Sequence, residues 1–560
     1  MKHLILLLTL LSGSCIYAQI PTSHLIDWQA KELSPSERRA NKFFTSVDVT
    51  LLDELTHSTS YYATLKAQQE TSDSTNIFSS FISSSYAAGE TEGDFLTYEG
   101  KSSYDWRLQG FGIHDFGKYG ILLGALQYNR GKHRDISWSA MRYPEYYLPY
   151  AKTDSTGGDS QYETYYILGG YSVNLHNWHL GVKTEFEGEQ SYRLTDPRNL
   201  TNTTFLSFGA SLGHIFPKGN TLTLHTEYMH NKQYEHDRYW RPGEQQRFFT
   251  LYGFGLYDTR ESIVAFGTSR MFYIHSIEGR LTYQTPTQKR CRLTLAMQYG
   301  HKHLYTEESD IINLYESDTH ELSPFIHFQW EINNNFALKL CSKNYLLEKT
   351  GTENFFEKYM TDQATSTYDF RLISQEHNYH QHRVDAHQAL RLEWKDGPKH
   401  KIGLQGGTKI DGNRETNSKY EYETKNLSIT PYARIDYSLR TSKHEFSIAL
   451  QGGKQRSLKH LYNVDILNDA IEHLDFQTCF APYAYNACEY KIGEADLYYL
   501  YHFPKFGLGC KITYMNLRGD RLDDVRYTKK IGFNSICPMI STEPDKHNEQ
   551  WGKFSIFVTL

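Results

Sequence analysis

No stretch of this sequence after the N-terminus is apolar enough to form a transmembrane helix. Such a helix needs on the order of 18 consecutive apolar residues, and polar or charged residues interrupt every apolar run before that length is reached. The mean hydropathy of −0.61 is correspondingly low. A helical membrane protein is therefore excluded.

Strong net charge and catalytic motifs are also missing. Lys and Arg number 59 against 65 Asp and Glu, which gives a formal net charge of −6, so we expect no nucleic-acid partner. The sequence has no Gly-x-Ser-x-Gly, no His-Glu-x-x-His and no glycine-rich phosphate loop. We therefore expect neither enzymatic activity nor a bound cofactor.

Cysteine is scarce and shows no metal-binding spacing. None of the residues lies in a Cys-x-x-Cys pair, and six remain after the predicted signal cleavage: Cys291, Cys341, Cys479, Cys488, Cys510 and Cys537. Only Cys479 and Cys488 are close in sequence, so a loop disulfide is one alternative for them in an oxidising compartment. Isolated thiols are the expectation for the others.

Aromatic residues, in contrast, are abundant. The chain has 44 Tyr, 30 Phe and 8 Trp, so 15% of its residues are aromatic. A sequence that is polar on average, rich in tyrosine and free of apolar helices is typical of a transmembrane β-barrel. In such a barrel, alternate strand residues face the lipid and a wet lumen.

Alternation along the chain supports this interpretation. Ile167 to Leu175 and Trp178 to Phe186 each have one apolar face, which places Leu180 toward lipid and Lys183 toward the lumen. The strands run about 10 to 15 residues, whereas strands of soluble sheets average five to six. The charged faces predict lumen residues that set selectivity: Lys183, Glu185, Glu187, Arg383, Asp385, Arg391, Arg434 and Asp436.

Short polar turns separate pairs of these strands and predict the topology. They lie at residues 117–120, 176–177, 217–220, 286–289, 333–335, 395–399, 441–444 and 504–507. With a first and a last strand added, residues 76–560 form one antiparallel barrel of about 18 strands (16–18), with short periplasmic turns and long extracellular loops. Residues 247–258 are either a further strand or a loop that folds inward.

The N-terminus predicts export. Met1-Lys2-His3 is basic, Leu4 to Leu11 is apolar, and Ala18 precedes a cleavage site, so residues 1–18 read as a signal peptide. A buried helix and lipidation at Cys15 are the alternatives. Residues 19–75 are predicted to be a periplasmic segment or a partial plug. We therefore expect the protein in the outer membrane of a Gram-negative bacterium.

The last residues of the sequence form an amphipathic strand. Phe554, Ile556, Val558 and Leu560 share one face of it. We expect this strand to pair with the first one, since a closed barrel leaves no edge unpaired. The expected partners are outer-membrane lipid and the barrel assembly machinery, for which this is the candidate assembly strand, together with envelope transport proteins.

Two further groups of residues are candidate binding sites. His380 and His382 lie two apart and share a strand face, with His387 nearby; such imidazoles can bind zinc, copper or haem iron, although solvated side chains are the simpler expectation. The loops Tyr143–Tyr150 and Asp237–Glu244 combine aromatic rings with charges. They suit a glycan or peptide surface, but we favour an interfacial aromatic belt.

Several loop motifs carry a resemblance to a known family. They are Gly93-Asp-Phe95 through Glu99-Gly-Lys101, Tyr143–Tyr150 followed by Asp154–Asp159, and Thr195-Asp-Pro-Arg198. In these the chain resembles an uncharacterised family of large outer-membrane β-barrel proteins of the Bacteroidota, known as a domain of unknown function. The resemblance implies fold and location and no reaction, and it slightly favours a role in envelope uptake.

Three functions remain from the sequence. The leading one is a porin-like channel or transport-system component with a polar lumen, through which solutes pass by diffusion or with partner proteins. The second is a non-conducting structural, adhesive or surface-display barrel that acts through its loops. A barrel enzyme is the least favoured. An open lumen would distinguish the first from the second.

Overall fold

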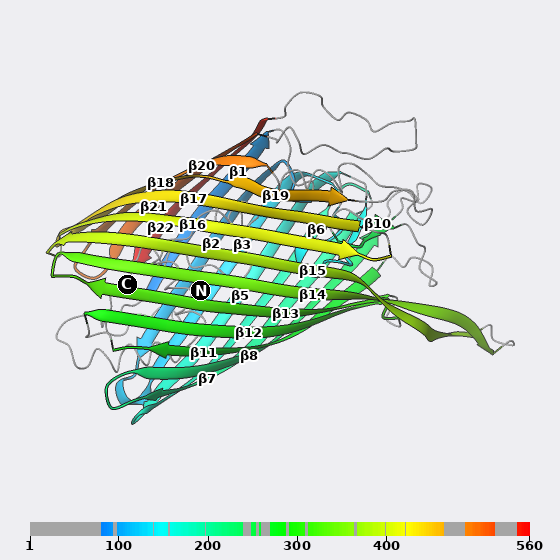
Figure 1. Ribbon diagram of the computed structural model, residues 1–560, viewed down its shortest axis with the longest axis horizontal. Helices are drawn as coiled ribbons and strands as arrows, with labels where there is room; N and C mark the ends of the chain where they lie inside the picture. Colours follow the sequence, from blue (N-terminus) through cyan, green and yellow to red (C-terminus); the bar gives the residue numbers. More distant parts are fainter. Residues whose placement is uncertain are drawn as a thin grey trace.

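The computed structural model is a single closed β-barrel (Figure 1). It describes residues 80–92, 98–137, 139–154, 157–196, 198–238, 248–253, 257–258, 269–286, 290–308, 312–362, 367–397, 399–419, 422–463, 488–520 and 546–559. The predicted signal peptide, the segment 19–75 and Leu560 lie outside these residues. No helix in the described part is long and apolar enough to cross a membrane.

Around its circumference the barrel wall has eighteen strand positions, and neighbouring strands are antiparallel. This confirms the predicted all-β fold. One position is shared by two consecutive strands, β18 and β19, which both pair with β17 and are separated at Gln455. In chain order the wall consists of β1 Ser80–Glu92, β2 Ser102–Asp115, β3 Ile121–Ile136, β5 Gly158–Leu175, β6 Trp178–Arg193, β7 Arg198–Ile215, β8 Thr221–Arg238, β11 Ser269–Gln284, β12 Cys291–Glu308, β13 Tyr315–Glu331, β14 Phe336–Asp362, β15 Thr367–Asp396, β16 His400–Asn417, β17 Tyr422–Arg440, β18 His444–Lys454, β19 Arg456–Asn463, β20 Glu489–His502, β21 Gly507–Asp520 and β22 Lys546–Thr559.

The barrel closes between its first and last strands. β1 pairs with β22 from Phe81 opposite Thr559 to Glu92 opposite Asn548, and with β2 on its other side. The predicted pairing of the C-terminal strand with the first strand is therefore confirmed. Closure leaves neither strand with an unpaired edge, as a lipid environment requires.

Eight short turns lie at one end of the barrel, at the left of Figure 1. They coincide with the eight turns predicted from the sequence, within a residue or two at their ends. One contains a short 3-10 helix, η1, Gly117–Tyr119. At the opposite end the chain makes longer excursions. We call these the short-turn end and the long-loop end.

The outer surface of the barrel carries an apolar band. Along β6, the outward residues Trp178, Leu180, Val182 and Phe186 are exposed, while the alternate Lys183 is buried inside. Exposed aromatic rings gather where the wall meets the short turns: Phe116, Trp178, Phe216, Trp330, Phe336, Phe503 and Phe506. A continuous apolar band with an aromatic girdle is stable only in a lipid bilayer. The barrel is therefore a membrane-spanning one.

Two features of the fold differ from the sequence interpretation. The strands are longer than predicted, and β14 and β15 reach 27 and 30 residues. Their outer parts, residues 354–362 and 367–376, have no further strand beside them and project as a ribbon from the long-loop end (Figure 1). The strands are long because they continue well beyond the bilayer, which the alternation of residues alone does not reveal.

Candidate functional site: a loop folded into the barrel

The connection between β3 and β5 folds into the barrel instead of facing outward. We call residues 139–154 the inner loop. It contains a single helical turn, α6 Pro144–Tyr147, and a short strand, β4 Lys152–Asp154. Tyr147, Tyr150 and Asp154 are 0% exposed. A surface loop does not reach such burial, so the inner loop is part of the interior.

A second connection joins the inner loop inside the barrel. The strands β9 Phe248–Leu251 and β10 Tyr257–Asp258 form a three-stranded antiparallel sheet with β4. The Leu251 amide donates to the Ala151 carbonyl at 2.8 Å, and the Gly253 amide donates to the Pro149 carbonyl at 3.0 Å. Of the two predictions for residues 247–258, the inward-folded loop is therefore correct for the described residues 248–253 and 257–258.

Aromatic side chains pack the inner loop against one side of the wall. The Tyr147 ring lies 5.1 Å from the Phe272 ring, and its hydroxyl donates to Asn231 Oδ1 at 2.8 Å. Tyr146 packs edge-on against Phe205, with ring centroids 5.6 Å apart. These contacts bury large apolar area and satisfy the tyrosine hydroxyl, as buried tyrosines require.

The inner loop also reaches β14, which lies three strand positions beyond β11 in the wall. Lys349 Nζ on β14 donates to the Leu148 carbonyl at 3.1 Å. A Cβ atom placed on Gly351 of the same strand would lie 2.8 Å from the Tyr150 hydroxyl and 2.9 Å from Pro149. Glycine is the residue that allows this close approach. The loop thus lies inside the barrel along six consecutive wall positions, from β7 to β14.

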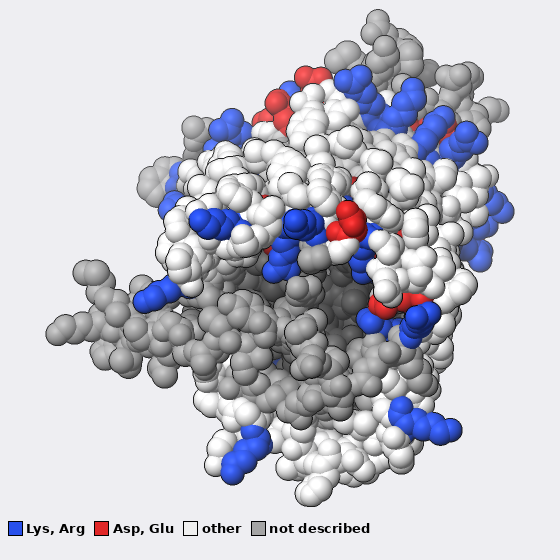
Figure 2. Space-filling model, turned by 90° about the vertical axis from the view of Figure 1, so that its left-hand side faces the viewer, with Lys and Arg blue, Asp and Glu red and all other residues white. Residues whose placement is uncertain are grey.

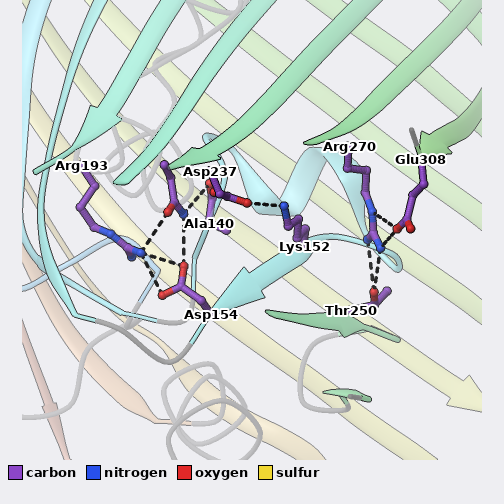
Figure 3. Close-up of polar contacts among 9 residues, drawn as sticks. Ala140, Lys152, Asp154, Arg193, Asp237, Thr250, Arg270 and Glu308 are labelled. Atoms are coloured by element: carbon purple, nitrogen blue, oxygen red, sulfur yellow. Dashed lines mark hydrogen bonds and ion pairs between the residues drawn. The ribbon is translucent and has the colours of Figure 1, made fainter. Parts of the chain in front are cut away.

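Buried ion pairs fix the inner loop in place (Figure 3). Lys152 pairs with Asp237 of β8, and both side chains are almost completely buried. Asp154 accepts hydrogen bonds at 2.8 and 2.9 Å from Arg193 of β6 and one at 3.1 Å from Asn199 of β7. Breaking a buried pair leaves an uncompensated charge, which costs about 3–5 kcal/mol. These contacts therefore resist withdrawal of the loop.

The second inner segment has its own charged anchor. Arg270 of β11 donates to the Thr250 hydroxyl at 3.2 Å and to Glu308 of β12 at 2.7 Å through Nε (Figure 3). All three residues are buried. Arginine suits this position because its planar group can bind a carboxylate and a hydroxyl at the same time.

Arg142 stabilises the start of the inner loop. Its Nε donates to Glu189 at 2.9 Å, and its guanidinium lies 3.9 Å from the Tyr162 ring centroid. Burial alone would lower the pKa of Arg142, but Tyr143 and Glu189 raise it above its ordinary value, so the group is charged. Tyr143 has a positive φ of 57°, which is uncommon for a bulky residue, and its hydroxyl donates to Glu189 at 2.6 Å.

The first group of predicted lumen residues lies on the inner wall nearer the short turns. Lys183 Nζ is 2.8 Å from Glu185 and 2.7 Å from Glu227 of β8, and the three side chains are at most 10% exposed. Glu187 is buried on the same face of β6. The structure therefore places all three predicted β6 residues inside the barrel.

The second group lies on β15 and β17 across the barrel. Arg391 binds Asp436 through two hydrogen bonds of 2.6 and 2.8 Å, and Arg434 is 3.4 Å from Asp496 of β20. Arg383 is 3.0 Å from Asp385. The lumen wall nearer the short turns thus alternates positive and negative groups. Seen from that end, the described residues leave a hollow (Figure 2).

The predicted histidine cluster is not brought together. His380 and His382 are exposed, while His387 is buried on the opposite face of β15 and contacts the Tyr432 hydroxyl at 2.6 Å. Alternate residues of a strand face opposite sides. His387 is an odd number of residues from His380 and His382, so the three side chains cannot bind the same ion. In the part of the chain that the structure describes, no group of three His, Cys, Asp or Glu side chains is arranged to hold a metal ion.

The Tyr143–Tyr150 interpretation needs correction. This stretch is neither an interfacial belt nor an exposed binding surface, because it packs inside the barrel. Most of Asp237–Glu244 lies outside the described residues, although Asp237 holds Lys152. Lys152, Asp154 and Arg193 were not among the residues predicted from the sequence as site residues. Continuing the inward alternation of β6 beyond Glu187 identifies Arg193 as an inward side chain, but no local pattern identifies its partner.

Comparisons with known proteins place the chain in a family. The profile described as "Family of unknown function (DUF6850)" matches residues 67–559. No curated protein matches the sequence. Similar solved structures include the copper transporter OprC (8% identity, 85% of this chain and 80% of that chain, TM-score 0.38) and the FrpB iron transporter from Neisseria meningitidis (8%, 85% and 81%, TM-score 0.37). Another is BauA, the ferric preacinetobactin receptor from Acinetobacter baumannii (7%, 85% and 79%, TM-score 0.36).

Proposed function

The chain belongs to the DUF6850 family of unknown function, and we propose that it is a transport barrel of the outer membrane with a gated lumen. The short turns would face the periplasm and the long loops the exterior, as is usual for outer-membrane barrels. Cleavage of residues 1–18 and passage through the assembly machinery by way of β22 are parts of this proposal. An origin in the Bacteroidota stays a prediction.

The observation that supports a gate is the position of the inner loop. It lies inside the lumen, where Arg193 of β6 and Asp237 of β8 hold its C-terminal end and Lys349 of β14 bonds its middle. Eighteen strands enclose more space than side chains of the wall alone can fill. A segment that occupies this space controls which solutes pass.

The lumen beyond the inner loop supports passage of polar solutes. Its wall carries the ion pairs of Lys183, Arg391 and Arg434. Charged groups arranged in this way make the wall polar and can select solutes by charge. We propose that these residues set selectivity, together with Glu185, Glu187, Arg383, Asp385 and Asp436, while the inner loop sets access.

Single-channel conductance in a planar bilayer tests the gate. We expect the wild-type barrel to show rare or small openings, and a variant with residues 139–154 replaced by a short glycine-serine linker to show frequent, larger ones. Lys152→Glu should also open the channel, because it places a second carboxylate against Asp237 in a buried site. Adding Asp237→Lys restores the opposite charges and should restore the closed behaviour.

Two controls make this experiment decisive. Arg414→Ala removes an exposed ion pair with Glu423 on the outer face of β16 and β17, away from the lumen, so it should leave the conductance unchanged. Heat-dependent gel mobility shows whether each variant is folded. If the folded linker variant is as silent as the wild type, transport through the lumen is ruled out in favour of a non-conducting barrel.

A non-conducting surface-display barrel is the second candidate, and the projecting ribbon of β14 and β15 favours it. Tyr359, Met360, Leu372 and Ile373 on this ribbon are exposed, far from the apolar band. Exposed apolar side chains outside the bilayer are typical of contact surfaces for other molecules. This candidate predicts silence of both the wild type and the linker variant.

Removing the ribbon should barely change barrel stability. An isolated two-stranded ribbon is marginally stable by itself, so joining Phe356 to its partner Leu372 through a short turn, which keeps the buried Asn354 and its bond to Glu316, is expected to change the free energy of unfolding by less than about 0.5 kcal/mol. Urea titration in lipid vesicles measures this. A large loss of stability would show that the ribbon belongs to the folding core and not to a display surface.

A further inference from the structure

Three basic side chains lie next to one another on the outer face of the barrel. Lys454 of β18 is directly opposite Lys491 of β20, and Lys491 is directly opposite Arg518 of β21. They face outward, because the alternate residues Ile492 and Leu517 are buried inside. The three cations thus form a row across three neighbouring strands near the long-loop end.

This row lacks a full set of negative partners. Lys454 is 2.8 Å from Glu489, whereas Lys491 and Arg518 make no ion pair with any residue that the structure describes. Like charges directly opposite one another on adjacent strands are destabilising. The position therefore favours binding of an anion from outside the chain.

A groove adjoins the row on the side of the short turns. Its volume is about 320 Å³, and its outward lining consists of Leu450, Gly452, Gly493, Ala495 and Tyr514 together with the polar Asn516. Gly452 lies two residues before Lys454, and Gly493 lies two residues after Lys491. Both glycines therefore share the outward face of these lysines. Leu450 and Tyr514 are exposed on it. Small residues between larger apolar ones make a furrow in the lipid-facing surface.

The row lies at a boundary between apolar and polar surface. Along the outer face of β18, Ile448 and Leu450 are apolar and exposed, Gly452 follows, and Lys454 ends the run. Basic side chains at the edge of an apolar band lie at the level of lipid headgroups. The groove, in contrast, lies at the level of the acyl chains.

We propose that Lys491, Arg518 and Lys454 bind the phosphate of a membrane lipid whose acyl chain occupies the groove between Leu450 and Tyr514. Charge complementarity selects a phosphorylated headgroup, and arginine binds phosphate through two parallel hydrogen bonds. The groove opens toward the bilayer, so its occupant comes from the membrane. In the orientation proposed above, this is the outer leaflet, which makes a phosphorylated, acylated glycolipid such as lipid A the fitting ligand.

The headgroup contact can be tested by counting bound lipid. The full-length barrel is reconstituted in phosphatidylcholine nanodiscs that contain diphosphoryl lipid A, and retained lipid is measured by native mass spectrometry. Each basic residue near a membrane surface contributes about a fivefold gain in binding of an anionic lipid. Lys491→Gln with Arg518→Gln should therefore weaken retention on the order of 25-fold. Lys443→Gln with Lys505→Gln removes the same charge from exposed short turns and should have no effect.

The acyl-chain contact needs a separate variant. A Cβ atom on Gly493 meets no atom within 4 Å, so Gly493→Leu fills the groove without a clash in the wall. We expect it to reduce lipid A retention while both cations remain. Gly279→Leu is the matched control, because a Cβ on Gly279 of β11 also meets nothing within 4 Å, and it should retain lipid A normally.

Two results would overturn the proposal. Dephosphorylated lipid A retained as well as the diphosphoryl form would show that the basic row does not bind phosphate. Normal retention by Gly493→Leu, together with binding of free inorganic phosphate in calorimetry, would show an anion site without a lipid. Neither readout depends on conductance, so a failed transport function and a failed lipid site remain distinguishable.

Discussion

Replacing Lys183 with leucine is expected to destabilise the barrel by about 3–5 kcal/mol, since it removes the cation from a buried ion pair. Lys183 Nζ lies between Glu185 and Glu227 at 2.8 and 2.7 Å. Without it, two carboxylates remain close together in a buried site. The sequence pattern alone places Lys183 on the lumen side and does not reveal its two carboxylate partners, so this prediction depends on the structure.

A neutral triple variant separates charge from packing. Lys183→Met with Glu185→Gln and Glu227→Gln removes all three charges and keeps similar shapes, and buried ion pairs replaced as a group often cost little. We expect its urea midpoint in lipid vesicles to return most of the way to that of the wild type. If the single and triple variants are equally unstable, the loss comes from packing and not from the unpaired carboxylates.

Val182→Arg is expected to cost about 2–4 kcal/mol, because it places a charge on the lipid-facing surface near the middle of the bilayer. Val182 is 56% exposed on the outside of the barrel. It lies within the outward apolar run from Trp178 to Phe186 on β6. Refolding into vesicles, followed by heat-dependent gel mobility across a urea series, measures the loss.

The control for this charge is on the same strand. Gln190 also faces outward on β6, but it lies beyond the apolar run, where its side chain bonds Asn202 at 3.0 Å. Charges near the membrane interface cost about 0–1 kcal/mol, so Gln190→Arg should refold almost like the wild type. Equal losses for Val182→Arg and Gln190→Arg would mean that the apolar band is misplaced on β6.

Local sequence patterns were sufficient to predict the barrel, its turns and the direction of most wall side chains. Alternation has a period of two residues, and it records locally whether a position such as Leu180 or Lys183 faces lipid or the interior. Turn residues between alternating segments are equally local, which is why the short turns and the number of strands were predictable. Pairing of β22 with β1 follows because a membrane barrel cannot keep a free edge.

The contents of the lumen and the pairing of its charges, in contrast, depend on contacts between distant parts of the chain. Lys152 and Asp237 are 85 residues apart in the chain, and Lys349 and Leu148 are 201 apart. Alternation gives the side of the wall on which a residue lies, but it carries no information about partners across the lumen. For Tyr147 and Tyr150, too, the local sequence does not give the location of the side chain. Their aromatic rings suit an exposed belt and a buried loop equally well, and the choice depends on the space that eighteen strands enclose.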